Sequence, residues 1–144
     1  MKVLIVEDEV EFIEIMKVFC EGWELRIAQT LEGALDRLKY EVFDLIVADL
    51  SLPDSYQPIS TFAHLHHAAM NVPLIVVTGS TNEGTGMKLK ELGAADFIFK
   101  DRITWKTFRE SVCAATGHCD LKPETTLRQI SGLTRELVRQ RING

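Results

Sequence analysis

Charged and hydroxyl side chains follow four short apolar runs of this chain, at the point where each run ends. Continuous apolar runs with polar ends are typical of strands buried on both faces of a parallel sheet. The carboxyl ends of parallel strands meet at one edge of the sheet, and ligands bind in the crevice outside that edge. We therefore expect the residues that follow the runs 3–6, 45–48, 74–77 and 97–99 to form one site: Glu7, Asp8, Asp49, Thr78 and Lys100.

Three of these side chains are carboxylates, those of Glu7, Asp8 and Asp49. Carboxylates that lie a few ångströms apart repel one another strongly unless a proton or a divalent cation lies between them. The sequence therefore predicts a metal site at this edge of the sheet, with Lys100 beside it.

Strand-like and helix-like segments alternate along the chain and supply the frame for this site. Besides the four runs, residues 23–28 predict a further strand. Thr30 is a suitable N-cap for the helix that follows, and Pro58 suits the first turn of another helix. The polar, glycine-rich stretch 79–86 reads as a loop. Helices are expected over about 12–20, 30–38, 58–70, 87–92 and 103–116.

Five strand–helix pairs of this length predict an α/β fold, a doubly wound five-stranded parallel sheet with helices on both faces. Residues 1–118 are expected to form this domain. Residues 119–144 are expected to form a linker and an amphipathic helix from about Pro123, whose apolar stripe is Leu127, Ile130, Leu133 and Leu137. We expect the stripe to pack on the domain itself, on a second copy of the chain or on an effector region, or else to be a simple connector.

Composition narrows the function classes. A net charge of −5 gives no reason to expect nucleic-acid binding by the body of the chain, although residues 120–144 carry five basic and three acidic side chains. The three cysteines are odd in number and lack C-x-x-C spacing, which predicts a reducing compartment and no disulfide. The sequence shows no signal peptide and no apolar run of the ~20 residues that a membrane span needs. We expect a cytoplasmic protein that does not bind membranes.

The motifs resemble those of the receiver domain of two-component response regulators, over about residues 1–118. The resemblance rests on five pieces in the right order and at the right intervals. They are Val-Glu-Asp at 6–8, Asp-Leu-Ser-Leu-Pro-Asp at 49–54, Val-Thr-Gly at 77–79, Gly-Ala-Ala-Asp-Phe at 93–97, and Lys100.

The resemblance implies a flavodoxin-like strand order 2-1-3-4-5 and a phosphoacceptor function. Asp49 would be the phosphoacceptor, attacking phosphorus through a carboxylate oxygen. Glu7 and Asp8, with Asp49 and the backbone carbonyl of Ser51, would hold Mg²⁺, which favours octahedral oxygen ligands. The remaining implied roles are phosphoryl binding by Thr78, Gly79 and Lys100, and switching by Thr78 and Phe97.

The implied partners are a sensor histidine kinase or a histidine phosphotransfer protein. If two chains pair, we expect the interface to be either the C-terminal helix, because of its apolar stripe, or the face formed by the fourth helix, fifth strand and fifth helix. The chain would be no enzyme beyond its own phosphorylation and dephosphorylation.

Two other functions compete with this one. A phosphatase of the haloacid-dehalogenase type also uses a strand-end aspartate and Mg²⁺, but it needs a second acid two residues later, where this chain has Ser51. A pseudo-receiver that only binds partners would lack some of the site residues, and here all are present. Metal binding by His64, His66 and His67 is a weaker hypothesis, because histidines on this helix are expected to lie on the surface. Metal binding by Cys113, His118 and Cys119 is similarly weak.

The chain departs from the family pattern at two loops. Asp101 replaces the proline that often follows the lysine, so we expect a trans peptide bond there and a weaker positive potential around Lys100. Gln57, followed by Pro58, replaces a common glycine before the third helix and alters the loop over the site.

Overall fold

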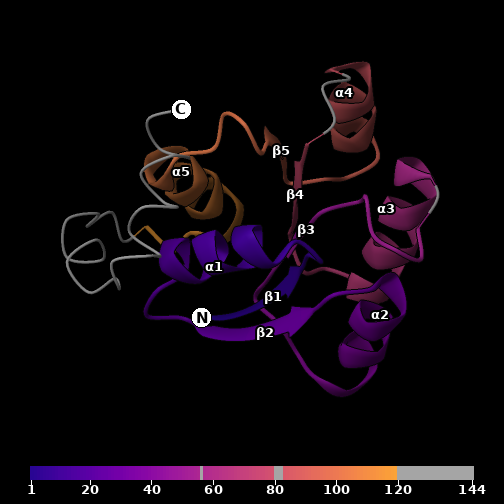
Figure 1. Cartoon of the computed structure of the whole chain (residues 1–144), viewed down its shortest axis with the longest axis horizontal. Coiled ribbons are helices and arrows are strands. Elements are labelled where there is room, and N and C mark those ends of the chain that lie inside the picture. Colours follow the sequence, from indigo (N-terminus) through magenta and orange to yellow (C-terminus); the bar gives the residue numbers. More distant parts are fainter. Residues whose placement is uncertain (56, 80–82, 120–144) are drawn as a thin grey trace.

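The structure, a computed structural model, describes residues 1–55, 57–79 and 83–119. In this part of the chain, strands and helices alternate from the N-terminus onward (Figure 1). The elements in chain order are β1 (Lys2–Val6), α1 (Val10–Phe19), β2 (Glu24–Ala28), α2 (Leu31–Tyr40), β3 (Leu45–Ala48), α3 (Pro58–Ala69), β4 (Leu74–Thr78), α4 (Glu83–Glu91), β5 (Asp96–Phe99) and α5 (Trp105–Thr116).

The strands form one parallel sheet in the order β2-β1-β3-β4-β5, which confirms the predicted doubly wound fold. Neighbouring residues of a strand point to opposite faces. Val3 and Ile5 of β1 therefore pack with α1 and α5, whereas Leu4 and Val6 pack with α2, α3 and α4. Figure 1 shows the same two layers, with α1 and α5 on one side of the sheet and the other helices opposite.

N-cap and first-turn residues determine where several of the helices begin. Thr30 caps α2, because its hydroxyl accepts a hydrogen bond from the Gly33 N–H at 2.9 Å. Pro58 occupies the first position of α3, as predicted. At α5, Thr104 and Thr107 form a reciprocal capping box that fixes where the helix begins.

Helix α4 begins four residues earlier than the sequence pattern indicates. The stretch 79–86 was expected to be a loop, but α4 starts at Glu83 and contains Gly84 and Gly86. Each glycine costs a helix about 1 kcal/mol relative to alanine. Packing against the sheet offsets this cost, since Leu89 is fully buried and Gly86 lies directly against the ring of Phe97.

The expectation of no disulfide is wrong, because Cys113 and Cys119 are bonded to each other. Gly117 ends α5 with a φ of 78°, a left-handed conformation that turns the chain back over the last helical turn. This turn brings the two Cα atoms to 4.6 Å. Cys20 is buried and free.

The expected trans peptide bond after Lys100 is present. Every peptide bond of the described residues is trans, including the bond from Lys100 to Asp101.

The predicted C-terminal helix, with its stripe from Leu127 to Leu137, lies outside the described residues. None of the helices within the described ranges is long and apolar enough to span a bilayer.

Candidate phosphoacceptor and metal site

Backbone hydrogen bonds fix the backbone positions from which the side chains of the predicted site project. The parallel ladder continues one residue beyond the strands, because the Asp49 N–H donates to the carbonyl of Val6 at 2.8 Å. In the same way, the Lys100 N–H donates to the carbonyl of Thr78 at 2.8 Å. The Glu7 N–H likewise donates to the carbonyl of Ala28 at 2.9 Å. The side chains at the carboxyl edge therefore emerge from rigid backbone.

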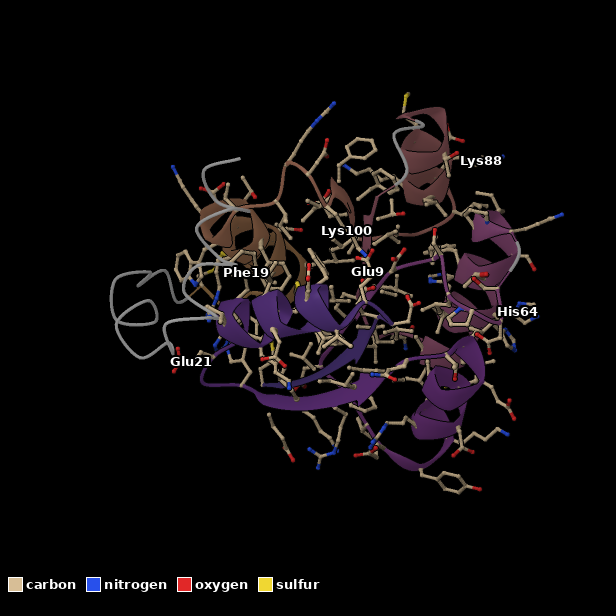
Figure 2. The ribbon with its side chains drawn as sticks, viewed as in Figure 1. Glu9, Phe19, Glu21, His64, Lys88 and Lys100 are labelled. Atoms are coloured by element: carbon tan, nitrogen blue, oxygen red, sulfur yellow. A yellow bond between two sulfur atoms is a disulfide. The ribbon has the colours of Figure 1, made fainter. Side chains whose placement is uncertain are left out.

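Lys100 lies at the centre of this edge. Its Nζ is 2.8 Å from Glu7 Oε2, 2.8 Å from Asp49 Oδ2 and 2.9 Å from Glu9 Oε2. The ammonium also lies 4.7 Å from the ring centroid of Phe12, which forms one wall. Figure 2 shows Lys100 and Glu9 side by side. Burial alone would lower the pKa of Lys100, but the hydrogen bonds to Asp49, Glu7 and Glu9 outweigh it and raise the pKa.

The carboxylates of Glu7, Asp8 and Asp49 form the predicted cluster. One oxygen from each lies within 4.8 Å of the others, close enough for a single cation to contact all three. Glu7 is 2% exposed, and its burial raises the pKa of the carboxyl above its ordinary value. Three carboxylate oxygens at this spacing are hard ligands of the kind that divalent cations such as Mg²⁺ prefer, so the cluster fits such an ion.

Asp49 is held at both carboxylate oxygens. Oδ2 accepts from Lys100, and Oδ1 accepts from the backbone N–H of Ser51 at 2.9 Å. The loop that follows is anchored by the hydroxyl of Ser55, which donates to the carbonyl of Leu50 at 2.7 Å. The nucleophile candidate is thus 5% exposed and oriented before any partner arrives.

The same loop is tied to α2 by Asp54. Its carboxylate accepts from the N–H groups of Leu31 and Glu32, at 2.8 and 3.0 Å. The hydrogen bonds from Glu32 and Leu31 hold the pKa of Asp54 below its ordinary value. The end of the Asp49 loop therefore serves as a second cap for the N-terminus of α2.

Thr78 and Gly79 end the neighbouring strand. Thr78 is 4% exposed and follows the buried run of β4. Gly79 is exposed, and a Cβ added to it would have nothing within 4 Å. A side chain at position 79 would therefore extend into open space.

Phe97 lies under α4. Its backbone pairs with Val76, so its ring faces the same side of the sheet as α4. A Cβ built on Gly86 would come within 2.7 Å of Phe97 Cδ1, so only glycine leaves room for the ring in this position. Phe99 packs against Phe97 edge to face, with 5.0 Å between ring centroids.

The structure brings Glu7, Asp8, Asp49 and Lys100 into one site, with Thr78 and Gly79 at the same edge of the sheet. Ser51 takes part through its backbone N–H. The sequence analysis missed Glu9, which contacts Lys100 from 91 positions away. The signal for Glu9 was a third acid directly after Glu7-Asp8.

The histidines of α3 lie apart from this site. His64 is exposed on the outer side of α3 (Figure 2), and its Nδ1 lies 2.8 Å from the carbonyl of Ser60. His66 is not a simple surface residue, because its ring stacks on Phe62 at 5.2 Å and lies against Gly93.

Residues 3–107 match the model of the response regulator receiver domain family, and the chain belongs to this family. The cell cycle transcriptional regulator CtrA of Caulobacter vibrioides is 33% identical over 103 residues, which are 69% of this chain and 44% of CtrA. The chain spans still less of several other curated relatives, 22% to 26% of their length.

Solved receivers have the same fold. A response regulator receiver domain protein from Methanospirillum hungatei JF-1 superposes with a TM-score of 0.68 at 26% identity, covering 77% of this chain and 89% of the other. A Burkholderia pseudomallei response regulator, solved with a phosphorylated aspartic acid, a calcium ion and citrate, gives a TM-score of 0.65 at 22% identity. That match covers 79% of this chain and 65% of the other.

Proposed function

We propose that this chain is a phosphoacceptor receiver, phosphorylated on Asp49 by a sensor histidine kinase or a histidine phosphotransfer protein in a Mg²⁺-dependent reaction. The observation that carries the proposal is the contact of 2.8 Å between Lys100 Nζ and Asp49 Oδ2, beside the cluster of Glu7, Asp8 and Asp49. A buried carboxylate next to an ammonium and a potential cation site can accept a phosphoryl group, because both positive charges oppose the charge that arrives with it.

The proposed reaction uses Asp49 as the nucleophile. A carboxylate oxygen attacks phosphorus, the bond from phosphorus to the donor histidine nitrogen breaks, and an acyl phosphate forms on Asp49. Lys100 donates to a phosphoryl oxygen, and Thr78 offers its hydroxyl to another. The open space above Gly79 admits the phosphodonor.

The cation is assigned to Glu7, Asp8, Asp49 and the backbone carbonyl of Ser51. When bound, Mg²⁺ would supply positive charge next to the phosphoryl oxygens. The three carboxylates fit it, since one oxygen of each lies within 4.8 Å of the others and carboxylate oxygens are the hard ligands that Mg²⁺ prefers.

Labelling with a small phosphodonor tests the proposal. Acetyl phosphate with Mg²⁺ should phosphorylate the wild type and the Asp101→Asn variant, whose exposed carboxylate adjoins Lys100, but not the Asp49→Asn variant. Mass mapping should place the label on Asp49, and a chelator present during the reaction should prevent labelling. Equal labelling of the Asp49→Asn variant would contradict the assignment, and no labelling of the wild type would favour a pseudo-receiver.

The conformational change that follows phosphorylation would involve Thr78 and Phe97. Phosphorylation adds roughly two negative charges and three strong acceptors at Asp49. Thr78 would move toward them and leave room for Phe97 to change position, which would reshape the face of α4, β5 and α5. This is a shift between two packings of one fold. Shifts of amide resonances near Phe97 on phosphorylation would support it, and shifts confined to the metal site would oppose it.

The domain division also remains our proposal: a receiver over residues 1–118, followed by a linker and an amphipathic helix over 119–144. The homodimer would form through that helix or through the face of α4, β5 and α5. Because the proposed phosphodonors act inside the cell, we propose a cytoplasmic location.

A further inference from the structure

Lys100 has more carboxylate partners than a phosphorylated site can keep. An ammonium group offers three N–H donors. In the structure three carboxylate oxygens, from Glu7, Glu9 and Asp49, lie within 2.9 Å of Nζ. A phosphoryl oxygen that needs a donor from Lys100 must therefore take the place of one of them.

The three carboxylates differ in how easily they can leave. The side chains of Glu7 and Asp49 are 3% and 5% exposed, so neither can turn into water without rearrangement. The side chain of Glu9 is 59% exposed. Rotating a part-exposed side chain into solvent costs little, because water replaces the ion pair. Of the three carboxylates, Glu9 is therefore the one that can turn into solvent and free an N–H of Lys100.

The backbone position of Glu9 supports the same conclusion. Glu9 is the N-cap residue of α1, yet its side chain makes no capping hydrogen bond and reaches toward Lys100 instead. The free N–H groups of a helix N-terminus attract negative charge. A Glu9 carboxylate released from Lys100 therefore has a favourable place beside the first turn of α1.

We propose that Glu9 is a displaceable counter-ion of Lys100, an inference that rests on the proposed phosphoacceptor function. In the unphosphorylated protein Glu9 occupies the third N–H of Lys100 and holds the ammonium beside Asp49. The incoming phosphoryl group displaces it, so Glu9 acts as a positioning residue that slows phosphorylation. Its release carries the phosphorylation signal to the start of α1, on the opposite side of the sheet from α4.

Two substitutions with the same charge change test this proposal. Glu9→Gln removes the charge that competes for Lys100, and Glu9→Ala removes the contact altogether. Glu11→Gln is the matched control, since Glu11 is exposed in the first turn of α1. With acetyl phosphate and saturating Mg²⁺, we expect the Glu9 variants to be labelled about two- to fivefold faster than the wild type, the size expected for one part-exposed ion pair. The Glu11→Gln rate should stay near that of the wild type.

A second readout does not depend on the rate. Beryllofluoride with Mg²⁺ mimics the phosphoryl group, and in the wild type it should shift the amide resonances of Val10 to Phe12 as Glu9 leaves Lys100. In Glu9→Ala these shifts should largely disappear, while those near Phe97 remain.

Equal labelling rates for the Glu9 and Glu11 variants, or unchanged shifts at α1 in Glu9→Ala, would overturn the inference. In either case the wild type would still be labelled on Asp49. A wild type that takes no label would instead overturn the proposed function, so the two failures are distinguishable.

Discussion

At the scale of single residues, Lys100 compensates the charge of two carboxylates that are almost fully buried. We expect Lys100→Ala to lower the free energy of unfolding by about 3 kcal/mol in the absence of divalent cations, because Glu7 and Asp49 lose their partner. Excess Mg²⁺ should restore much of the loss, since a cation at the cluster replaces the ammonium. Urea denaturation with and without Mg²⁺ measures both effects.

The control for this prediction is Lys17→Ala, which breaks a surface ion pair of α1 with Glu14. Its cost should stay within about 1 kcal/mol and be the same with and without Mg²⁺. A Lys100→Ala variant whose loss of stability is independent of Mg²⁺ would show that the three carboxylates do not share an ion. Phosphorylation of the Asp49 side chain should also fail in Lys100→Ala.

At the scale of elements, Asp54 joins the loop after β3 to the N-terminus of α2. Asp54→Ala should lower the free energy of unfolding by about 1 kcal/mol at neutral pH, as loss of a capping side chain does. The folded state lowers the pKa of Asp54, so its contribution is complete above the ordinary value of 3.8 and is lost as the pH falls below it. Denaturation at a series of pH values should show the difference between wild type and variant shrinking below that value. A difference that persists at low pH would contradict the capping role.

The disulfide belongs to the same scale, because it closes the end of α5 over Gly117. Closing a loop with a sequence separation of 6 stabilises the folded chain by about 2 kcal/mol in the chain-entropy description. A reductant should therefore lower the free energy of unfolding of the wild type and leave a Cys113→Ala/Cys119→Ala variant unchanged. Thiol titration of the unfolded, unreduced protein should find only Cys20, and titration of all three cysteines would refute the bond.

At the scale of the whole molecule, the C-terminal segment carries the predicted apolar stripe and a charge opposite to that of the rest of the chain. The net charge of residues 120–144 is positive and that of the rest is negative, which favours docking on the domain or pairing of two chains. We expect truncation after Cys119, which keeps the disulfide, to change the oligomeric state or lower the melting temperature. Light scattering and thermal denaturation measure these quantities. A truncated chain that matches the full chain in both would make the segment a simple connector.

Much of the molecule could be predicted from the sequence because the signals are local. Apolar runs ending in polar residues located β1, β3, β4 and β5, and parallel pairing then required their carboxyl ends to meet. The contacts that the sequence did not predict depend on tertiary structure. Glu9 reaches Lys100 only because their strands end at the same edge, and the bond from Cys113 to Cys119 depends on the left-handed turn at Gly117. The start of α4 depends on packing that offsets two glycines.

The contact between Gly86 and Phe97 has a consequence for how receivers diverge. Because a side chain at position 86 would occupy the space of the Phe97 ring, the two positions cannot change independently. In relatives, a residue larger than glycine at the first position should be accompanied by a smaller residue at the second, or by an aromatic ring turned away from α4. The residue types at these two positions should therefore covary among solved receivers.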